Sequence, residues 1–166
     1  MKRLLRCIAL VALAAGLAAC GPPRKSVYPP TVTIQQMSVR PDGQWQLTLR
    51  IQNNSYTGMG FRSIDGALQI GDGVPVRLHA DFKRDIPALS GDVVTLDVLP
   101  TPAMGQALAA VAAKGSAGSL AYRISGRTNA TPEQDQDDDK PEKPRDFDFH
   151  GNDWLSPVPG IPNTYR

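Results

Sequence analysis

The sequence predicts a mainly β fold, in which two antiparallel sheets pack as a sandwich beside one short helix. Short segments that alternate apolar and polar residues recur between residues 31 and 127, and this alternation is typical of strands with one buried face. Gly and Pro number 15 each in 166 residues, and turn residues separate the segments. Six or seven such strands favour an antiparallel β-sandwich of the immunoglobulin or fibronectin-III-like kind.

The clearest strand is WQLTLRIQ, which places Trp45, Leu47, Leu49 and Ile51 on one face and polar residues on the other. The same alternation predicts further strands, with Val74 expected inward at the start of the second of them. These segments are IDGALQI (64–70), VPVRLHADF (74–82), VVTLDVL (93–99) and LAYRIS (120–125). Residues 71–73 (GDG) join the first two segments and predict a tight hairpin.

The first strand and the helix show two local signals. TVTIQQMSV (31–39) changes the phase of its alternation at Gln35-Gln36, which predicts a β-bulge there. A helix is predicted after Thr101, which can cap it, with Pro102 in its first position and Gly115 after its end. Three apolar residues at helical spacing form its packing stripe: Met104, Leu108 and Val111.

The N-terminus has the features of a bacterial lipoprotein signal peptide, residues 1–19. A basic start precedes a short apolar run that is too short to span a bilayer, which needs about 20 residues. The run ends in Leu17-Ala18-Ala19-Cys20, which resembles a lipobox and implies cleavage before Cys20 and attachment of lipid to its sulfur. The alternative is an ordinary signal peptide followed by a free or buried cysteine.

Loss of residues 1–19 would leave 15 basic and 16 acidic residues, a net charge of −1 instead of +2. A nearly neutral chain gives no electrostatic reason to expect a nucleic-acid partner. Cys7 would leave with the signal, so no disulfide is expected. Gly21 after the lipidated cysteine favours the periplasmic face of the outer membrane over the inner membrane of a Gram-negative bacterium. Residues 20–30 are predicted to be the lipidated cysteine and a proline-rich tether that reaches roughly 30 Å.

The region after residue 127 divides into two parts. Residues 128–145 are polar and charged, and predict an acidic linker or an exposed loop. Asp135, Asp137 and Asp139 have a spacing like that of an EF-hand, but Lys140 replaces the required glycine, so a solvated linker is favoured over a calcium site.

Residues 146–166 are predicted to form an edge strand and an irregular tail, because Asp146 to His150 alternate and three prolines follow. This segment holds three aromatic residues: Phe147, Phe149 and Trp154. They are possible partner contacts, although packing back onto the domain is the favoured interpretation.

No residue set predicts catalysis, a cofactor or a small-molecule substrate. The two histidines, His79 and His150, lie far apart in the sequence, and His79 is expected on the exposed face of a strand. Two separated histidines without a free cysteine do not predict a zinc site. There is no nucleophile elbow and no glycine-rich phosphate loop.

The region 31–127 resembles the type 2 late embryogenesis abundant proteins, whose domain is also called the water stress and hypersensitive response domain. A strand runs into Asn53-Asn54-Ser55, where the family often has Asn-Pro, followed by SIDGALQIGDGVPV and later IPALSGDVVTLDV. Asn54 therefore departs from the family pattern. The resemblance implies an antiparallel sandwich with one helix, an association with dehydration or envelope stress, and no enzymatic activity or active-site residues.

The resulting hypothesis is a non-enzymatic, lipid-anchored periplasmic protein that serves as a stress-protective or scaffold module. The alternative is an accessory lipoprotein that docks an envelope protein complex through a strand edge or its C-terminal segment.

Overall fold

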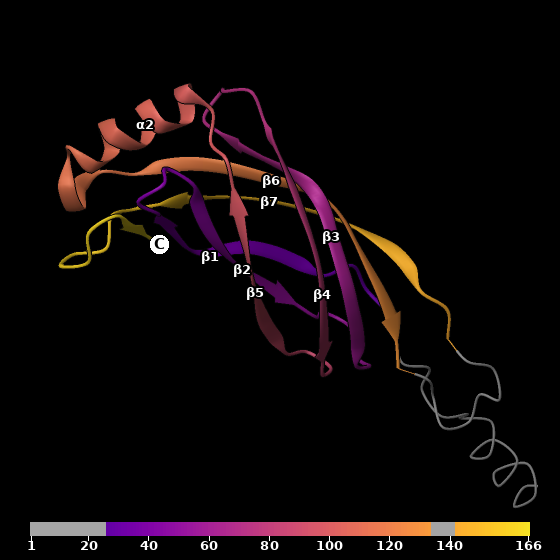
Figure 1. The fold of residues 1–166 in the computed structure, drawn as a ribbon. Helices are drawn as coiled ribbons and strands as arrows, with labels where there is room; N and C mark the ends of the chain where they lie inside the picture. The colour runs from indigo at the N-terminus through magenta and orange to yellow at the C-terminus, as the bar shows by residue number, and fades with distance from the viewer. Residues whose placement is uncertain (1–25, 134–141) are drawn as a thin grey trace, which may run out of the picture.

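Two four-stranded antiparallel sheets form the fold in the computed structural model, which describes residues 26–133 and 142–166 (Figure 1). One sheet has the order β5-β2-β1-β8 and the other β4-β3-β6-β7. The strands are β1 (Thr31–Val39), β2 (Trp45–Gln52), β3 (Met59–Ile70), β4 (Val76–Ile86), β5 (Gly91–Val98), β6 (Leu120–Pro132), β7 (Arg145–Leu155) and β8 (Thr164–Tyr165). The mainly β, two-sheet architecture predicted from the sequence is confirmed.

The core lies between the inner faces of the two sheets, where the alternating apolar residues meet. The four residues of the WQLTLRIQ face are all buried, as are Leu68, Leu96 and Ile124 on three other strands. These strands therefore have one buried face, as their alternation predicts.

The predicted bulge in β1 is present. The pairing of β1 with β2 shifts between Ile34 and Gln36, so Gln35 is the extra residue. The backbone N–H of Ile34 donates to the hydroxyl of Tyr122, 3.0 Å away on the opposite sheet. Burial raises the pKa of the Tyr122 hydroxyl. The bulge thus provides a hydrogen bond that ties the two sheets together across the core.

The helix α2 (Pro102–Ala112) is followed by a short 3₁₀ turn, η1 (Gly115–Ala117). Thr101 caps α2, since its hydroxyl accepts from the backbone N–H of Met104 at 3.2 Å. Met104, Leu108 and Val111 are buried as predicted. Among the residues that the structure describes, no helix is long and apolar enough to cross a membrane.

The predicted boundary after residue 127 is wrong, because β6 continues to Pro132. Thr128 and Ala130 are buried in this extension, and the Thr128 hydroxyl donates to the carbonyl of Ser63 at 2.7 Å. The inward side chains of residues 128–132 are small, so the sequence no longer alternates between large apolar and polar residues although the strand continues. The interval predicted as an acidic linker therefore contains the ends of two strands, with residues 134–141 outside the described part.

The C-terminal segment is an integral part of the sandwich. The predicted edge strand is present as β7, and it pairs with β6 over its whole length, from Arg145 opposite Ala130 to Leu155 opposite Leu120. The tail was predicted to be irregular, but it contains β8, which pairs with β1 and buries Tyr165. The prolines end at Pro162, which leaves residues 163–165 free to pair.

Two expectations about exposure also need correction. Val74 is 73% exposed, because the β3–β4 connection runs through Pro75 and β4 begins only at Val76. The second half of the tether is not a free spacer: Val27 packs against the core and Pro30 is buried.

A cluster of polar residues explains why the chain before β1 is held in place. The Asn54 side-chain amide donates to the carbonyl of Pro29 at 2.9 Å, a bond that a proline at position 54 could not make. The neighbouring Asn53 is buried, and its amide donates to the carbonyls of Thr57 and Ile86 at 2.9 and 3.1 Å. Asn54 thus holds the end of the tether against the domain.

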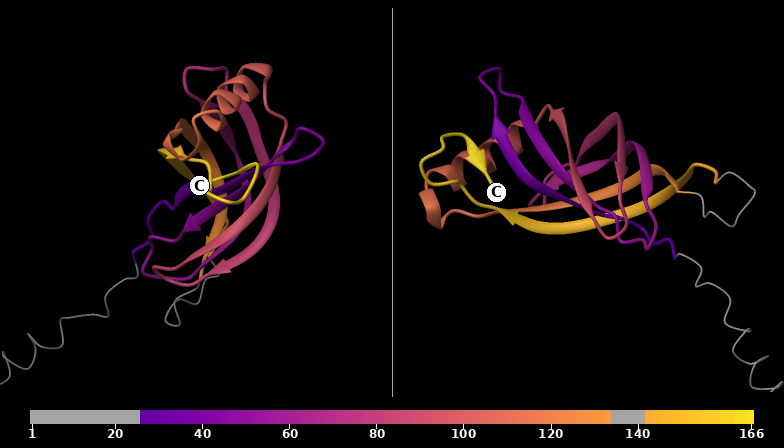
Figure 2. Two further views of the ribbon diagram at one scale, coloured as in Figure 1. Left: turned by 90° about the vertical axis from the view of Figure 1, so that its left-hand side faces the viewer. Right: turned by 90° about the horizontal axis from the view of Figure 1, so that it is seen from below.

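The antiparallel strands give the molecule two distinct ends (Figures 1 and 2). We call one the tether end, made of residues 26–30 and the loops 53–58 and 87–90. The other is the far end, made of the loops 40–44, 71–75 and 156–163 together with residues 99–119, which include α2. The 13 residues of β6 run between the two ends, a distance of about 40 Å.

Candidate functional site

A groove of about 780 Å³ lies on the outer face of the β4-β3-β6-β7 sheet, toward the far end. Most of its lining residues occupy the outward positions of three neighbouring strands, opposite in parity to the buried residue Leu68. These outward residues are Ala67 and Gln69 of β3, Ala121, Arg123 and Ser125 of β6, and His150, Asn152 and Trp154 of β7. The β3–β4 connection adds Gly71, Asp72 and Pro75, and the alternate strand positions add Tyr122, Ile124, Gly151 and Asp153.

The depth of the groove follows from the sizes of these side chains. The sheet register places Ala121 opposite Trp154, and Ser125 between Ala67 and His150. Ala121 and Ser125 on the middle strand thus form low parts of the floor on either side of Arg123, while the larger Trp154 and His150 stand on the outer strand β7. Trp154 is 62% exposed, so its indole presents a large apolar surface to a ligand in the groove.

One charged pair lies at the groove. Arg123 Nη2 lies 3.3 Å from Asp72 Oδ1 and donates to the carbonyl of Gly71, also at 3.3 Å. Both side chains are largely exposed to solvent, so the pair contributes little to stability and its groups can rearrange around a ligand. The groove therefore combines an exposed aromatic ring with hydrogen-bonding groups that solvent now reaches.

A second polar group, Asp65, Arg77 and His79, lies on the same outer face farther along the strands. Arg77 Nη2 is 2.6 Å and His79 Nδ1 is 3.3 Å from Asp65 Oδ2. The hydrogen bond from Arg77 lowers the pKa of the Asp65 carboxyl and raises that of the Arg77 guanidinium. His79 is half-exposed on its strand, in agreement with the sequence prediction. All three side chains are at the surface, which is typical of a solvated strand face.

The three aromatic residues proposed as partner contacts do not form one strip. Phe147 and Phe149 occupy inward positions of β7, whereas Trp154 occupies an outward position. Phe149 is 3% exposed, and Phe147 is partly buried against the core with the Arg145 guanidinium 5.7 Å from its ring centre. Packing, the favoured interpretation, holds for Phe149 and largely for Phe147. Trp154 alone remains available to a partner.

The other sequence-based site predictions divide between described and undescribed residues. Cys20 and the acidic run of Asp135, Asp137 and Asp139 lie outside the described residues. Within residues 26–133 and 142–166, no three His, Cys, Asp or Glu side chains are grouped so that they could hold a metal ion. His150 is exposed and lines the groove.

Sequence reasoning missed the groove itself, including Gln69, Arg123 and Asn152. The alternation of LAYRIS does place Ala121, Arg123 and Ser125 on one outer face, and the small size of Ala121 and Ser125 is a signal for a depression. The partners of these residues, however, come from β7, whose pairing with β6 no local pattern specifies.

No family model and no curated protein match the sequence. Solved structures that match include the Northeast Structural Genomics Consortium target SoR45, with a TM-score of 0.45 and 12% identity, covering 82% of this chain and 92% of that chain. A protein from Archaeoglobus fulgidus matches with a TM-score of 0.37 and 11% identity, over 80% and 100%. AT1g01470 from Arabidopsis thaliana matches with a TM-score of 0.39 and 14% identity, over 86% and 87%. Identities this low carry no information on activity or partners.

Proposed function

We propose that this chain is a non-enzymatic, lipid-anchored periplasmic protein that binds an envelope protein through the groove beside Trp154. The observation that carries the proposal is the exposed indole of Trp154 in the groove, opposite the small side chain of Ala121. Tryptophan is enriched among the residues that dominate protein interfaces. The adjacent Arg123, Asn152 and Asp153 supply the polar groups that fix a partner's orientation.

The position of the groove suits this function. The groove includes residues of the β3–β4 connection at the far end, whereas the predicted anchor, Cys20, precedes the tether end. With the strands spanning about 40 Å, a protein anchored at Cys20 holds the groove away from its own membrane. This arrangement supports docking of a partner within the periplasm or on the facing envelope layer.

Anchoring predicts the behaviour of a Cys20→Ala variant. Without the sulfur that accepts lipid, the protein should move completely from the membrane to the soluble periplasmic fraction, because the acyl chains supply the stable membrane attachment. Cell fractionation and immunoblotting measure this, and Ser26→Ala is a control substitution that keeps the cysteine. Retention of Cys20→Ala in membranes that have been washed with salt would contradict the lipid anchor.

Partner binding predicts site-specific cross-linking in cells. A photoreactive residue at position 152 in the groove should yield a discrete adduct with one protein, whereas the same residue at Thr95, exposed on the other sheet, should not. Adding Trp154→Ala should reduce the adduct roughly tenfold, as expected for loss of an interface residue that contributes more than 1.4 kcal/mol. An identical set of adducts from both positions would refute a specific groove interaction.

The stress-protective module implied by the family resemblance stays a prediction. It would be favoured if no adduct formed at position 152 and if the purified protein preserved the activity of an unrelated enzyme during drying.

A further inference from the structure

The exposed apolar residues of the described segments gather at the two ends of the sandwich. Tyr28, Tyr56 and Leu89 are 47%, 60% and 58% exposed, and all three belong to the tether end. The rings of the two tyrosines meet edge to face, with centroids 6.3 Å apart. The tether end thus presents two aromatic rings and a leucine side chain to solvent, on the segment that follows the predicted anchor and on two loops packed beside it.

These residues are held in place by backbone hydrogen bonds around a buried serine. The Ser55 hydroxyl accepts from the N–H of Tyr28 at 2.9 Å, and its carbonyl accepts from the N–H of Leu89 at 3.2 Å. The N–H of Tyr56 donates to the carbonyl of Ser26 at 3.0 Å. Three separate segments of the chain are therefore joined at Ser55, and their exposed apolar side chains form one preorganised surface.

The backbone conformation of Leu89 is a second indication that this surface has a function. Leu89 has a φ of +55°, a left-handed conformation that is unfavourable for a bulky residue. Glycine or asparagine would satisfy the same turn at lower cost. A leucine here, more than half exposed, does not serve the stability of the domain and points to a role in binding.

The length of the chain before residue 26 determines what lies near this surface. Ser26 is the sixth residue after Cys20, and six residues span at most about 20 Å when fully extended. Because residues 27–30 are fixed to the domain, the tether end cannot move farther than this from lipids attached to Cys20. The far end, about 40 Å along the strands, is not so confined.

We infer that the tether end is a membrane-contact surface, in which Tyr28, Tyr56 and Leu89 lie in the interfacial layer of the bilayer that holds the lipids of Cys20. The inference rests on the lipid anchor of the proposed function. Tyrosine is enriched at this depth because its ring is apolar and its hydroxyl remains hydrated. The contact would orient the sandwich upright, with the groove facing away from the membrane.

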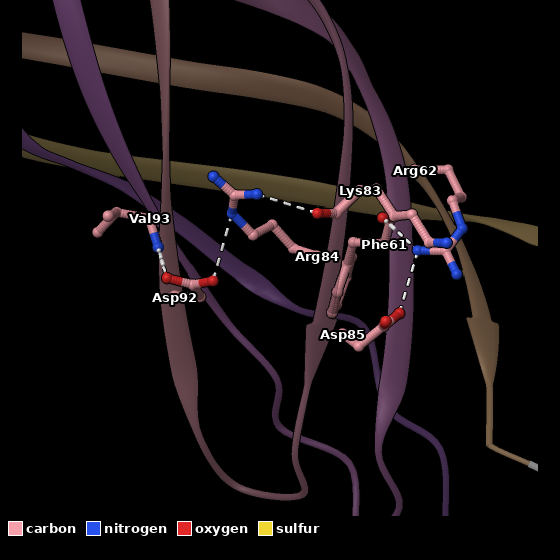
Figure 3. A network of polar contacts seen from close by, with 7 residues as sticks. All are labelled: Phe61, Arg62, Lys83, Arg84, Asp85, Asp92 and Val93. Carbon is pink, nitrogen blue, oxygen red and sulfur yellow. Dashed lines mark hydrogen bonds and ion pairs between the residues drawn. The ribbon is translucent and has the colours of Figure 1, made fainter.

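The charges behind this surface indicate that the contact is apolar and not ionic. Arg62 lies 3.2 Å from Asp85, and Arg84 lies 3.4 Å from Asp92, a pair that bridges the two sheets (Figure 3). Both arginines thus have a carboxylate partner, and Arg145 likewise lies 3.5 Å from Glu142, so these pairs offer little net charge to lipid headgroups. Contact is therefore expected with vesicles of neutral phosphatidylcholine and should persist in salt, which screens ionic attraction.

The test uses the full lipidated protein in phosphatidylcholine vesicles. Since Cys20 is occupied by lipid, a single new cysteine can be labelled with an environment-sensitive fluorophore, at Ala88 in the tether end or at Asp42 in the far end. Quenching by aqueous iodide should fall severalfold at position 88 when the protein is reconstituted, and should be unchanged at position 42. Equal quenching at both positions in vesicle-bound protein would overturn the inference.

Variants distinguish contact of the tether end with the bilayer from attachment through the lipid anchor and from self-association. Combining Tyr56→Ser with Leu89→Ser should restore quenching at position 88, whereas Leu99→Ser at the far end should not, with melting curves confirming that all variants fold. Co-flotation of the protein with vesicles measures the lipid anchor independently of the fluorophore. A protein that does not float would contradict the lipid anchor of the proposed function and not the contact surface. Protection at position 88 that increases with the protein-to-lipid ratio would instead show contact with a second copy and overturn the inference.

Discussion

Replacing Gly126 by alanine should destabilise the domain by roughly 3 kcal/mol, because overpacking a tight site forces the backbone to move. Gly126 of β6 pairs with Gly66 of β3, and both occupy inward positions. A Cβ on Gly126 would come within 3.0 Å of the Asp65 carbonyl oxygen and of the Gly66 Cα, closer than real Cβ atoms approach. These neighbours are backbone atoms of a central strand, so the clash cannot be relieved by rotating a side chain.

The helix offers a matched control for this substitution. Gly105 lies within α2, and a Cβ there would have no neighbour within 4 Å. Gly105→Ala should therefore stabilise the protein by about 1 kcal/mol through helix propensity alone. Urea unfolding monitored by circular dichroism measures both variants. If Gly126→Ala unfolded at the same urea concentration as the wild type, the close approach of β3 and β6 would be wrong.

Most of the fold could be predicted because most strands carry large apolar residues in strict alternation. Leu47, Leu49 and Ile51 show a period of two that only a half-buried strand explains, and the phase change at Gln35 revealed a bulge. The second half of β6 could not be predicted this way. Its inward residues Thr128 and Ala130 are small, and the burial of Thr128 depends on a hydrogen bond to Ser63 that lies 65 residues away.

The ends of the domain escaped prediction for a related reason. The chain at residues 26–30 contains one serine and two prolines, and its attachment depends on Asn54 and Ser55 in a distant loop. β8 is only two residues long and is defined by its partner β1 and not by any pattern of its own. Local sequence carries no information on such pairings, because the contacts that stabilise them are formed only in the folded domain.

The candidate site could be predicted from the sequence only in part. Period two along β7 separates Phe147 and Phe149 from Trp154, so parity alone indicates that the three aromatics cannot share a face. Which of the two faces of β7 is buried depends on the register of its pairing with β6. The groove was unpredictable because its floor and its wall come from strands whose adjacency no local pattern encodes.

Phe149→Ala should cost about 3–5 kcal/mol of unfolding free energy, the range for removing a buried phenylalanine. Phe149 lies opposite Gly126 in the register, and a Cβ on Gly66 would lie only 3.2 Å from its ring Cζ. The ring thus fills the space that two glycines leave on neighbouring strands, in the manner of an aromatic side chain covering glycines in a sheet. Alanine would leave a cavity there that the close-packed backbones cannot collapse to fill.

Trp154→Ala is the matched control, since it removes a larger ring from the same strand at an outward position. Its unfolding free energy should stay within about 0.5 kcal/mol of the wild type, as is usual for exposed residues, while its cross-linking from position 152 should fall roughly tenfold. The two variants together distinguish residues of β7 that pack in the core from the residue that contacts a partner. If Phe149→Ala were as stable as Trp154→Ala, β7 would not be part of the core and the groove that depends on it would not exist.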